Sequence, residues 1–416
     1  MGSDEARRGQ DLLSQPVNIL FLSTWYPYPP DNGSKLRALY LLRSLAAQHD
    51  VTALAFRPSS SDAVAGASHA NLPVTAVPDD PFRHVNAPQW VKYLSPAPLV
   101  FRASPAMQRA VASLDNRSWD AVVAIQMPMA QYALAVDAHA RIIDVDTALS
   151  YQMRERYLSL ARPISRASAW VSWQKAYRYD RNMLRRFQAA AVVLQAEIPP
   201  LQAMVDENRC RVALIPNGVD CAHNRPGLAQ PQPGTLVFNG SLTYSANYDA
   251  MQWFLAQVWP RIRAQLPEAT LVITGSTTGV NLAGLALDDH VRLLGYVEDV
   301  RIPVAEAAVA IAPIRQGGGT RLKILEAMAL GTPVVATRKG AEGLDVTDGV
   351  DIVLADEPAA FAAAVLRLLR DPAERTRLAA NARQLVEQRY DWDAIGQRFV
   401  ALVEDVVAQR RQERAA

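Results

Sequence analysis

The sequence predicts an α/β protein built from two doubly wound, Rossmann-like domains that face a central cleft. Two observations lead to this prediction. Short apolar runs that fit buried strands alternate with helical segments in two series, one on each side of a Pro-, Gly- and Gln-rich stretch. The chain also has 416 residues, which is too long for one ordinary hydrophobic core. We therefore expect domains at residues 17–223 and 235–391, joined by a linker at 224–234.

The first domain is expected to open with a strand, a loop, a helix and a second strand, the unit that begins a doubly wound fold. Apolar runs place the strands at 18–22 and 50–56, and helical apolar spacing places the helix at 35–48. Pro, Asp, Asn and Gly mark the intervening loop at 26–34, and residues 57–90 are expected to be mostly connections. Further strands are expected at 121–125, 141–144, 190–194 and 212–215.

The second domain repeats the alternation of strands and helices. Its helices include 249–266 and 324–330, and terminal helices are expected at 359–369, 373–388 and 392–409. We expect the C-terminal segment 392–413 to pack back on the first domain. The strands of this second series are expected at 236–238, 271–274, 291–293, 309–312, 334–336 and 352–354.

Composition excludes several classes of protein. Half of the residues are hydrophobic and 20% are charged, which is typical of a soluble globular protein, and a net charge of +2 gives no case for nucleic-acid binding. Two cysteines, Cys210 and Cys221, are too few for a disulfide scaffold and are expected to be reduced. No apolar run is long enough to cross a bilayer, and no signal sequence is evident, so we expect a cytoplasmic protein. Cys and His show no metal-ligand spacing, so no metal site is expected.

A glycine-rich loop before a helix carries the clearest chemical signal. Gly317, Gly318 and Gly319 allow close approach of the backbone to an anion, and the following helix aims its free N–H groups at that point. Arg321 and Lys323 add positive charge in the first helical turn, where cations oppose the helix dipole unless an anion offsets them. We interpret this segment as a diphosphate site. The alternative is a loop that only turns the chain, with both cations in solvent.

Two other phosphate-binding patterns are absent. The loop lacks the Gly-Lys-Ser/Thr order of a Walker A motif, and no G-x-G-x-x-G follows the first strand, which argues against a dehydrogenase.

Several short motifs stand out along the chain. The most specific are KILEAMALGTPVVAT at 323–337 and GAEG at 340–343. Supporting pieces are IPNGVD at 215–220, FNGS at 238–241, GYVEDV at 295–300 and YDW at 390–392. Together these motifs resemble the GT-B glycosyltransferases, and within them the retaining family GT4. They are similar in sequence to a bacterial subgroup associated with exopolysaccharide and surface-glycan synthesis.

The resemblance implies an enzyme that transfers a sugar from a nucleoside diphosphate sugar, its co-substrate, to an acceptor hydroxyl. It also implies retention of the anomeric configuration and no metal or other cofactor. The acceptor is expected to be a small molecule or a lipid-linked molecule. Two alternatives stay open on the same fold, a nucleotide-sugar epimerase and a non-catalytic nucleotide-sugar-binding protein.

The resemblance also implies roles for individual residues. Glu326 matches the second glutamate of the family's Glu-x7-Glu motif, which holds the donor ribose hydroxyls; the alternative is an acid that merely favours the helix dipole. The other expected donor-binding residues are Gly240, Ser241, Tyr296, Val297, Gly317, Gly318, Gly319 and Thr320. The expected acceptor-side residues are Asn32, Gly33, Ser34, Asp144 and Asp146.

Three departures from the family pattern affect the catalytic assignment. Gly318 stands where the first glutamate of the motif belongs, and the segment 241–249 lacks the family's Arg and Lys pair. We expect Arg321 and Lys323 to neutralise the diphosphate instead. Gln126 stands where the family often has a His after the strand at 121–125, and we expect it to replace that contact to the sugar.

Two further features have competing interpretations. Asp144 and Asp146 follow a strand and either face the cleft or cap the next helix. The segment from Arg154 to Arg186 combines many basic residues with Trp and Tyr. Such a helix either lies on an anionic membrane surface or packs on the core with a solvated basic face.

Overall fold

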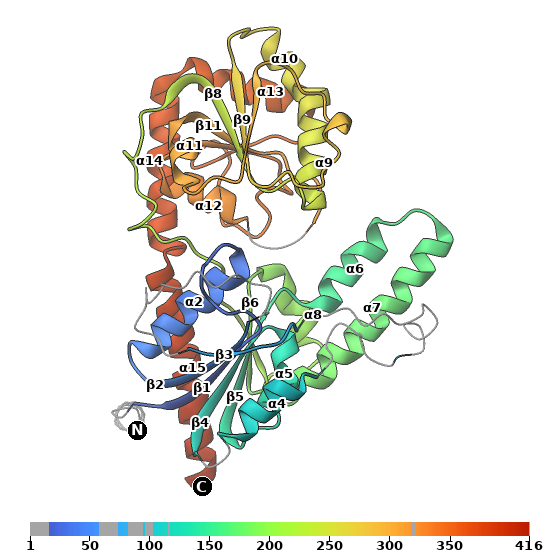
Figure 1. The fold of residues 1–416 in the computed structure, drawn as a ribbon, viewed down its shortest axis with the longest axis vertical. Coiled ribbons are helices and arrows are strands. Elements are labelled where there is room, and N and C mark those ends of the chain that lie inside the picture. The colour runs from blue at the N-terminus through green and yellow to red at the C-terminus, as the bar shows by residue number, and fades with distance from the viewer. Residues whose placement is uncertain are drawn as a thin grey trace. The chain divides into compact units, whose positions relative to one another are not determined.

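The structure, a computed structural model, describes residues 16–57, 74–81, 95, 103–114, 117–317 and 321–415. The described residues form two compact units, one made of those up to Pro216 together with those from Gly396 onward, and the other of those between Asn217 and Ile395. Each unit is an α/β layer structure around a parallel sheet (Figure 1), so the predicted pair of Rossmann-like domains is confirmed.

The first unit has a parallel sheet with the strand order β3-β2-β1-β4-β5-β6-β7 in its described part. Chain order reverses between β1 and β4, which is the switch point where doubly wound sheets bind ligands. The strands are β1 (Asn18–Ser23), β2 (Asp50–Phe56), β3 (Val74–Val77), β4 (Trp119–Ile125), β5 (Ala138–Asp146), β6 (Ala189–Val192) and β7 (Arg211–Leu214).

Helices cover this sheet and bury its apolar residues. The main core joins β1, β4 and β5 to the helices, for example through Leu22, Met129 and Ile143. The helical elements are α2 (Gly33–Ala46), α4 (Pro105–Ala112), η1 (Met127–Met129), α5 (Ala130–Ala133), α6 (Leu149–Ser159), α7 (Pro163–Leu184), η2 (Gln195–Glu197), α8 (Ile198–Gln202) and α15 (Trp392–Ala415).

The second unit repeats the plan with the strand order β10-β9-β8-β11-β12-β13, and its switch point lies between β8 and β11. The strands are β8 (Gln232–Asn239), β9 (Thr270–Thr274), β10 (Val291–Gly295), β11 (Ala307–Ala312), β12 (Val334–Ala336) and β13 (Val353–Leu354). The helical elements are α9 (Ser245–Trp253), η3 (Phe254–Val258), α10 (Trp259–Arg263), η4 (Leu282–Gly284), α11 (Arg301–Glu306), α12 (Leu322–Ala329), α13 (Pro358–Arg370) and α14 (Pro372–Arg389).

The chain passes from the first unit to the second between Pro216 and Asn217, ahead of the expected linker at 224–234. The reason is that the intervening segment is hydrogen-bonded within the second unit. The amide of Val219 donates to the carbonyl oxygen of Tyr390 at 2.8 Å. The guanidinium of Arg383 donates to the carbonyl oxygens of Cys221 at 2.9 Å and Asn224 at 2.5 Å.

The C-terminal helix α15 belongs to the first unit from Gly396 onward. Gly396 lies against Ser44 of α2, so closely that a Cβ there would overlap the Ser44 hydroxyl. Farther along α15, the Arg411 guanidinium donates to the Asp120 carboxylate at 2.8 Å. Close packing and this ion pair hold the helix on the first sheet.

Three expectations about elements are corrected. β3 lies inside the stretch 57–90, which was expected to be mostly connections and for which no strand was predicted. The helix expected at 249–266 is interrupted by the π-helical turn Phe254–Val258, just before Pro260 removes a backbone N–H. The basic segment 154–186 forms two helices, because Pro163 starts a new helix at its first position.

Candidate active site

The first set of candidate residues lies at the switch point of the second sheet. β8 ends at Asn239, and α12 follows β11 on the other side of the switch. The Asn239 side-chain amide donates to Glu326 Oε2 at 2.8 Å, and its Oδ1 accepts from the Thr274 hydroxyl at 3.1 Å. Glu326 of α12 is thereby fixed against the ends of β8 and β9.

Lys323 lies one helical turn before Glu326 and reaches the same strand end. Its Nζ donates to Asn247 Oδ1 at 2.8 Å and lies 4.2 Å from the centroid of the Phe238 ring. A Cβ at Gly240 would lie only 2.6 Å from this Nζ, so glycine at 240 leaves the space that the ammonium occupies. α12 therefore delivers a positive charge to the β8 loop, where the sequence lacks the family's basic pair.

Burial changes the protonation of both side chains. Burial and, to a smaller extent, the nearby Arg321 lower the pKa of Lys323 to about 7, against the attraction of Glu326. Burial also raises the pKa of Glu326 to about 7, although Lys323 and the hydrogen bond from Asn239 oppose this shift. Two ionisable groups whose charged forms are poorly solvated mark a candidate functional site.

Arg321 directly precedes α12 and does not lie in its first turn. Its side chain is buried, and its guanidinium donates to the carbonyl oxygens of Gly317 at 2.8 Å and Lys339 at 3.2 Å. Arg321 therefore ties the start of the glycine-rich segment to the loop after β12. Gly317 has a φ of 87°, which favours glycine, whereas Gly318, Gly319 and Thr320 lie outside the described residues.

The remaining donor-side candidates lie on neighbouring loops of the same sheet edge. The Ser241 hydroxyl donates to the carbonyl oxygen of Ser276 at 3.0 Å. Tyr296 and Val297 directly follow β10, and Tyr296 is 81% exposed. The amide of Gly275 donates to the carbonyl oxygen of Gly295 at 2.8 Å, which joins the loops after β9 and β10.

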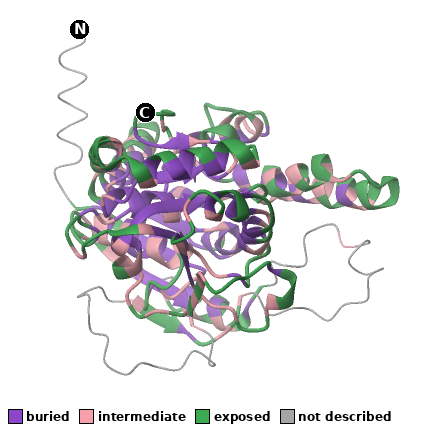
Figure 2. Cartoon of the chain, turned by 90° about the horizontal axis from the view of Figure 1, so that it is seen from above, coloured by how far each residue is buried: buried purple, intermediate pink, exposed green. Residues whose placement is uncertain are grey.

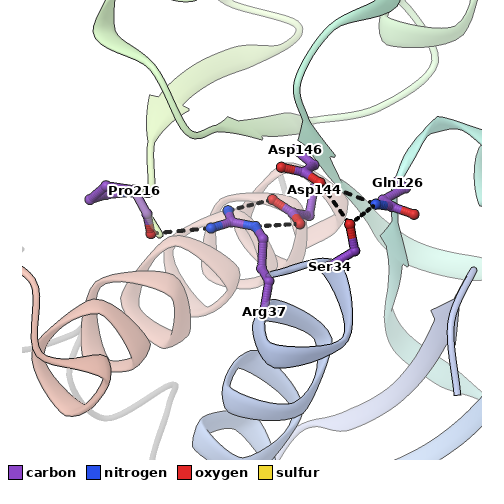
Figure 3. A network of polar contacts seen from close by, with 6 residues as sticks. All are labelled: Ser34, Arg37, Gln126, Asp144, Asp146 and Pro216. Carbon is purple, nitrogen blue, oxygen red and sulfur yellow. Dashed lines mark hydrogen bonds and ion pairs between the residues drawn. The ribbon is translucent and has the colours of Figure 1, made fainter. Parts of the chain in front are cut away.

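The second set of candidates lies at the switch point of the first sheet. Figure 3 shows Gln126, at the end of β4, pointing toward Ser34 of α2 and Asp146 of β5. The Gln126 side-chain amide donates to the Ser34 hydroxyl at 3.0 Å and to Asp146 Oδ2 at 3.1 Å. The Ser34 hydroxyl also donates to Asp146 Oδ2 at 3.4 Å. Three expected site residues are thus brought together.

Backbone strain supports a functional role for this cluster. Gln126 has φ 71° and ψ 153°, a conformation that is nearly exclusive to glycine. Asp146 has φ 59°. Each such residue costs on the order of 1–3 kcal/mol, and strain of this kind is concentrated at active sites.

Asp144 lies on β5, two residues before Asp146, and is fully buried. Its two carboxylate oxygens accept from Arg37 Nε at 2.7 Å and from Arg37 Nη2 at 2.6 Å, and Arg37 Nη1 donates to the carbonyl oxygen of Pro216 at 3.1 Å (Figure 3). Neither Asp144 nor Asp146 caps the next helix, because α6 has Ala148 at its N-cap with no side-chain hydrogen bond. The capping interpretation is therefore wrong.

Sequence reasoning missed Arg37 and Glu197. Arg37 lies four residues before Leu41 on the buried face of α2, and a charged residue among apolar positions is the signal that could have found it. Glu197 lies in the turn after β6, and its Oε1 accepts from the Ala148 amide at 3.0 Å. Burial raises the pKa of Glu197 to about 8.

The other acceptor-side candidates have a local structural role. Asn32 is the N-cap of α2, where its side-chain oxygen accepts from the Lys35 amide at 3.0 Å, and Gly33 begins that helix. This cap fixes the start of α2 and so the position of Ser34, two residues later.

Two other kinds of feature are absent from the described ranges. No three His, Cys, Asp or Glu side chains there are grouped so that they could hold a metal ion. No helix in the same ranges has the length and apolar character needed to cross a membrane.

Comparison with known sequences places the second unit in a family. Residues 233–371 match the family described as Glycosyl transferases group 1. A glycogen synthase of Mycobacterium tuberculosis is 26% identical over an alignment of 423 positions, which covers 96% of each chain. A phosphatidyl-myo-inositol mannosyltransferase of Mycobacterium leprae is 34% identical over 202 residues, which cover 46% of this chain and 53% of the relative.

Comparison with solved structures extends the likeness to both units. A sucrose-phosphate synthase from Thermosynechococcus elongatus superposes with a TM-score of 0.72 at 17% identity, covering 94% of this chain and 100% of that structure. The HepE protein of Anabaena, solved in complex with UDP and glucose, gives a TM-score of 0.67 at 18% identity with the same coverage. At these identities the likeness establishes the fold.

Proposed function

Because this chain is a GT-B glycosyltransferase that carries a glycosyl transferases group 1 domain, we propose that it moves a sugar from a nucleoside diphosphate sugar to an acceptor hydroxyl. The observation that carries this proposal is the pairing of Lys323 and Glu326 on α12, both directed at the end of β8. A cation and a carboxylate one turn apart match the two polar parts of a nucleoside diphosphate, its phosphates and its ribose hydroxyls.

Lys323 is proposed to bind the diphosphate. Its ammonium is partly removed from water and donates to a neutral group, the side-chain oxygen of Asn247. An anion beside it would restore its charged form, which burial disfavours. This supports the assignment of Lys323 as replacement for the missing basic pair.

Arg321 is proposed to act indirectly, by fixing the backbone on which the diphosphate would bind. Its hydrogen bonds to Gly317 and Lys339 fix the carbonyl groups on each side of α12. Holding these carbonyl groups also holds the backbone around the N-terminus of α12, whose N–H groups can stabilise a departing diphosphate without rearrangement as the negative charge grows. This makes Arg321 a positioning residue.

Ser34, Gln126 and Asp146 are proposed to bind the acceptor or the transferred sugar. Together they present a hydroxyl, an amide and a carboxylate, the groups that proteins use to bind sugar hydroxyls. Asp144 and Arg37 lie behind them and hold β5 and α2 in register. We propose a small-molecule or lipid-linked acceptor and, from the family resemblance, retention of the anomeric configuration without a metal cofactor.

Replacing Glu326 by alanine is expected to weaken nucleoside diphosphate binding without unfolding the protein. Losing charge-assisted hydrogen bonds to the ribose costs about 1.5–3 kcal/mol, equivalent to about 10–150-fold in Kd. The ligand-free protein loses little, because burial already disfavours the charged carboxylate. The experiment is calorimetric titration with whichever of UDP, GDP, ADP and dTDP gives the largest thermal shift in the wild type.

The matched control is Glu357→Ala, which removes an exposed glutamate from the same unit. We expect its affinity to equal that of the wild type. Unchanged affinity in Glu326→Ala as well would remove the ribose assignment, and no thermal shift with any of the four nucleotides would contradict the proposed donor class.

A further inference from the structure

The helical hairpin α6–α7 extends away from the sheet of the first unit. In Figures 1 and 2 the two helices lie side by side and project beyond the other elements of that unit. Aromatic contacts hold the pair together, because the rings of Tyr157 and Trp173 stack at a centroid distance of 5.6 Å. The Arg166 guanidinium lies 4.9 Å from the centroid of the Tyr157 ring. These contacts pack α6 and α7 against each other near the end of the hairpin.

Large apolar side chains are exposed near the turn of this hairpin. Leu158 is 52% exposed at the end of α6, Ile164 is 88% exposed at the start of α7, and Trp170 is 48% exposed two turns later. Single exposed apolar residues are normal on a protein surface. Three near one hairpin end, including the most exposed large apolar residue of the described ranges, indicate a surface that contacts an apolar phase.

The same segment carries a strong positive charge. Residues 154–186 have a net charge of +7, whereas the whole chain has +2. Of the two acidic residues in the segment, Asp180 is buried and accepts from the Ser150 amide at 2.9 Å, and Glu155 lies 3.8 Å from Arg154. The basic residues are Arg154, Arg156, Arg162, Arg166, Lys175, Arg178, Arg181, Arg185 and Arg186.

We propose that the end of this hairpin docks on the surface of an anionic phospholipid bilayer. Leu158, Ile164 and Trp170 enter the interface, where aromatic side chains are favoured, and the surrounding arginines bind lipid phosphates. A second copy of this chain is a poor occupant, because it would bring together two hairpin ends that each carry Arg154, Arg156, Arg162 and Arg166 against only Glu155. The inference goes beyond the proposed sugar transfer and does not depend on it.

The test is co-sedimentation of the full chain with vesicles. One set contains phosphatidylcholine alone, and the other contains phosphatidylcholine mixed with phosphatidylglycerol. We expect binding to the anionic vesicles, weaker at high salt. The triple variant Arg154→Gln/Arg156→Gln/Arg162→Gln is expected to bind them about 10²-fold more weakly, because each basic residue near the membrane surface contributes about fivefold to the affinity.

Apolar insertion is tested separately with Ile164→Ser/Trp170→Ser, which is expected to bind anionic vesicles about tenfold or more weakly. The matched control is Ile302→Ser/Val350→Ser, which replaces exposed apolar residues of the second unit and should bind like the wild type. All these side chains are exposed, so melting temperatures and nucleotide affinity should stay unchanged.

Three results would overturn the proposal. They are absence of binding to the anionic vesicles, equal binding by the hairpin variants and the control, and self-association of the wild type that Ile164→Ser/Trp170→Ser abolishes. Because nucleotide binding is measured without vesicles, failure of the membrane proposal is distinguishable from failure of the proposed transfer function.

Discussion

Replacing Lys323 by alanine is expected to lower kcat by about 10²–10³, the range found when one preorganised donor at a reacting centre is removed. The ammonium contacts a phosphate oxygen whose negative charge grows as the glycosidic bond breaks, so its effect is larger in the transition state than in the bound substrate. KM should therefore change much less than kcat. The measurement is steady-state kinetics of nucleoside diphosphate release.

Two other variants separate this role from simple structural support. Arg338→Ala removes an exposed cation of the same unit, which pairs with Asp356, and should keep wild-type kcat. Arg321→Ala should lower both kcat and the melting temperature, because it releases the carbonyl groups of Gly317 and Lys339. The melting temperature of Lys323→Ala should be close to that of the wild type, because burial disfavours the charged form of the lysine and its removal therefore costs little stability. Wild-type kcat in Lys323→Ala would reopen the search for the phosphate ligand.

Replacing Arg37 by methionine is expected to destabilise the first unit by about 3–5 kcal/mol, the usual cost of removing one partner from a buried ion pair. The Asp144 carboxylate would then be left in the core without its two charge-assisted hydrogen bonds. The measurement is urea denaturation at pH 7, followed by tryptophan fluorescence and circular dichroism.

The double variant Arg37→Met/Asp144→Leu provides the control, because it removes both charges. It should recover most of the lost stability, as apolar replacements of buried ion pairs generally do. If Arg37→Met alone were as stable as the wild type, the ion pair would not hold β5 and α2 together. If instead the double variant stayed as unstable as the single one, lost packing would be the cause.

Most strands could be predicted because their sequences are continuous apolar runs. Parallel strands covered on both faces contain few polar residues, and 307–312 and 189–192 are fully buried, as such runs require. β3 was missed because Val74–Val77 is a short edge strand whose two central residues are exposed. Nothing in its local pattern separates it from a connection.

Part of the candidate site could also be predicted, because the expected strands indicate where the edge of the sheet lies. Residues at the ends of strands, such as Gln126 and Asp146, could be found because parallel strands place their carboxyl ends at one edge. Their partners could not, because the contacts join residues far apart in the sequence. Arg37 and Asp144 are separated by 107 positions, and Asn239 and Glu326 by 87.

Helix boundaries limited the assignment of the two cations. One residue of difference in the start of α12 decides whether Arg321 lies in the first turn or before it. Since Arg321 lies before it, its side chain turns to the loop carbonyls, while Lys323 in the second helical position reaches Asn247. The two cations that sequence reasoning treated alike therefore have different surroundings.

The central claim is sugar transfer, and the most direct measurement of it is product analysis by NMR and mass spectrometry. The protein is incubated with UDP-, GDP-, ADP- and dTDP-sugars and a library of small-molecule and lipid-linked acceptors. The account predicts a new glycosidic bond with the anomeric configuration of the donor, released nucleoside diphosphate in equal amount, and loss of both products in Lys323→Ala. An epimerised donor, or nucleotide binding with no product from any pair, would contradict it.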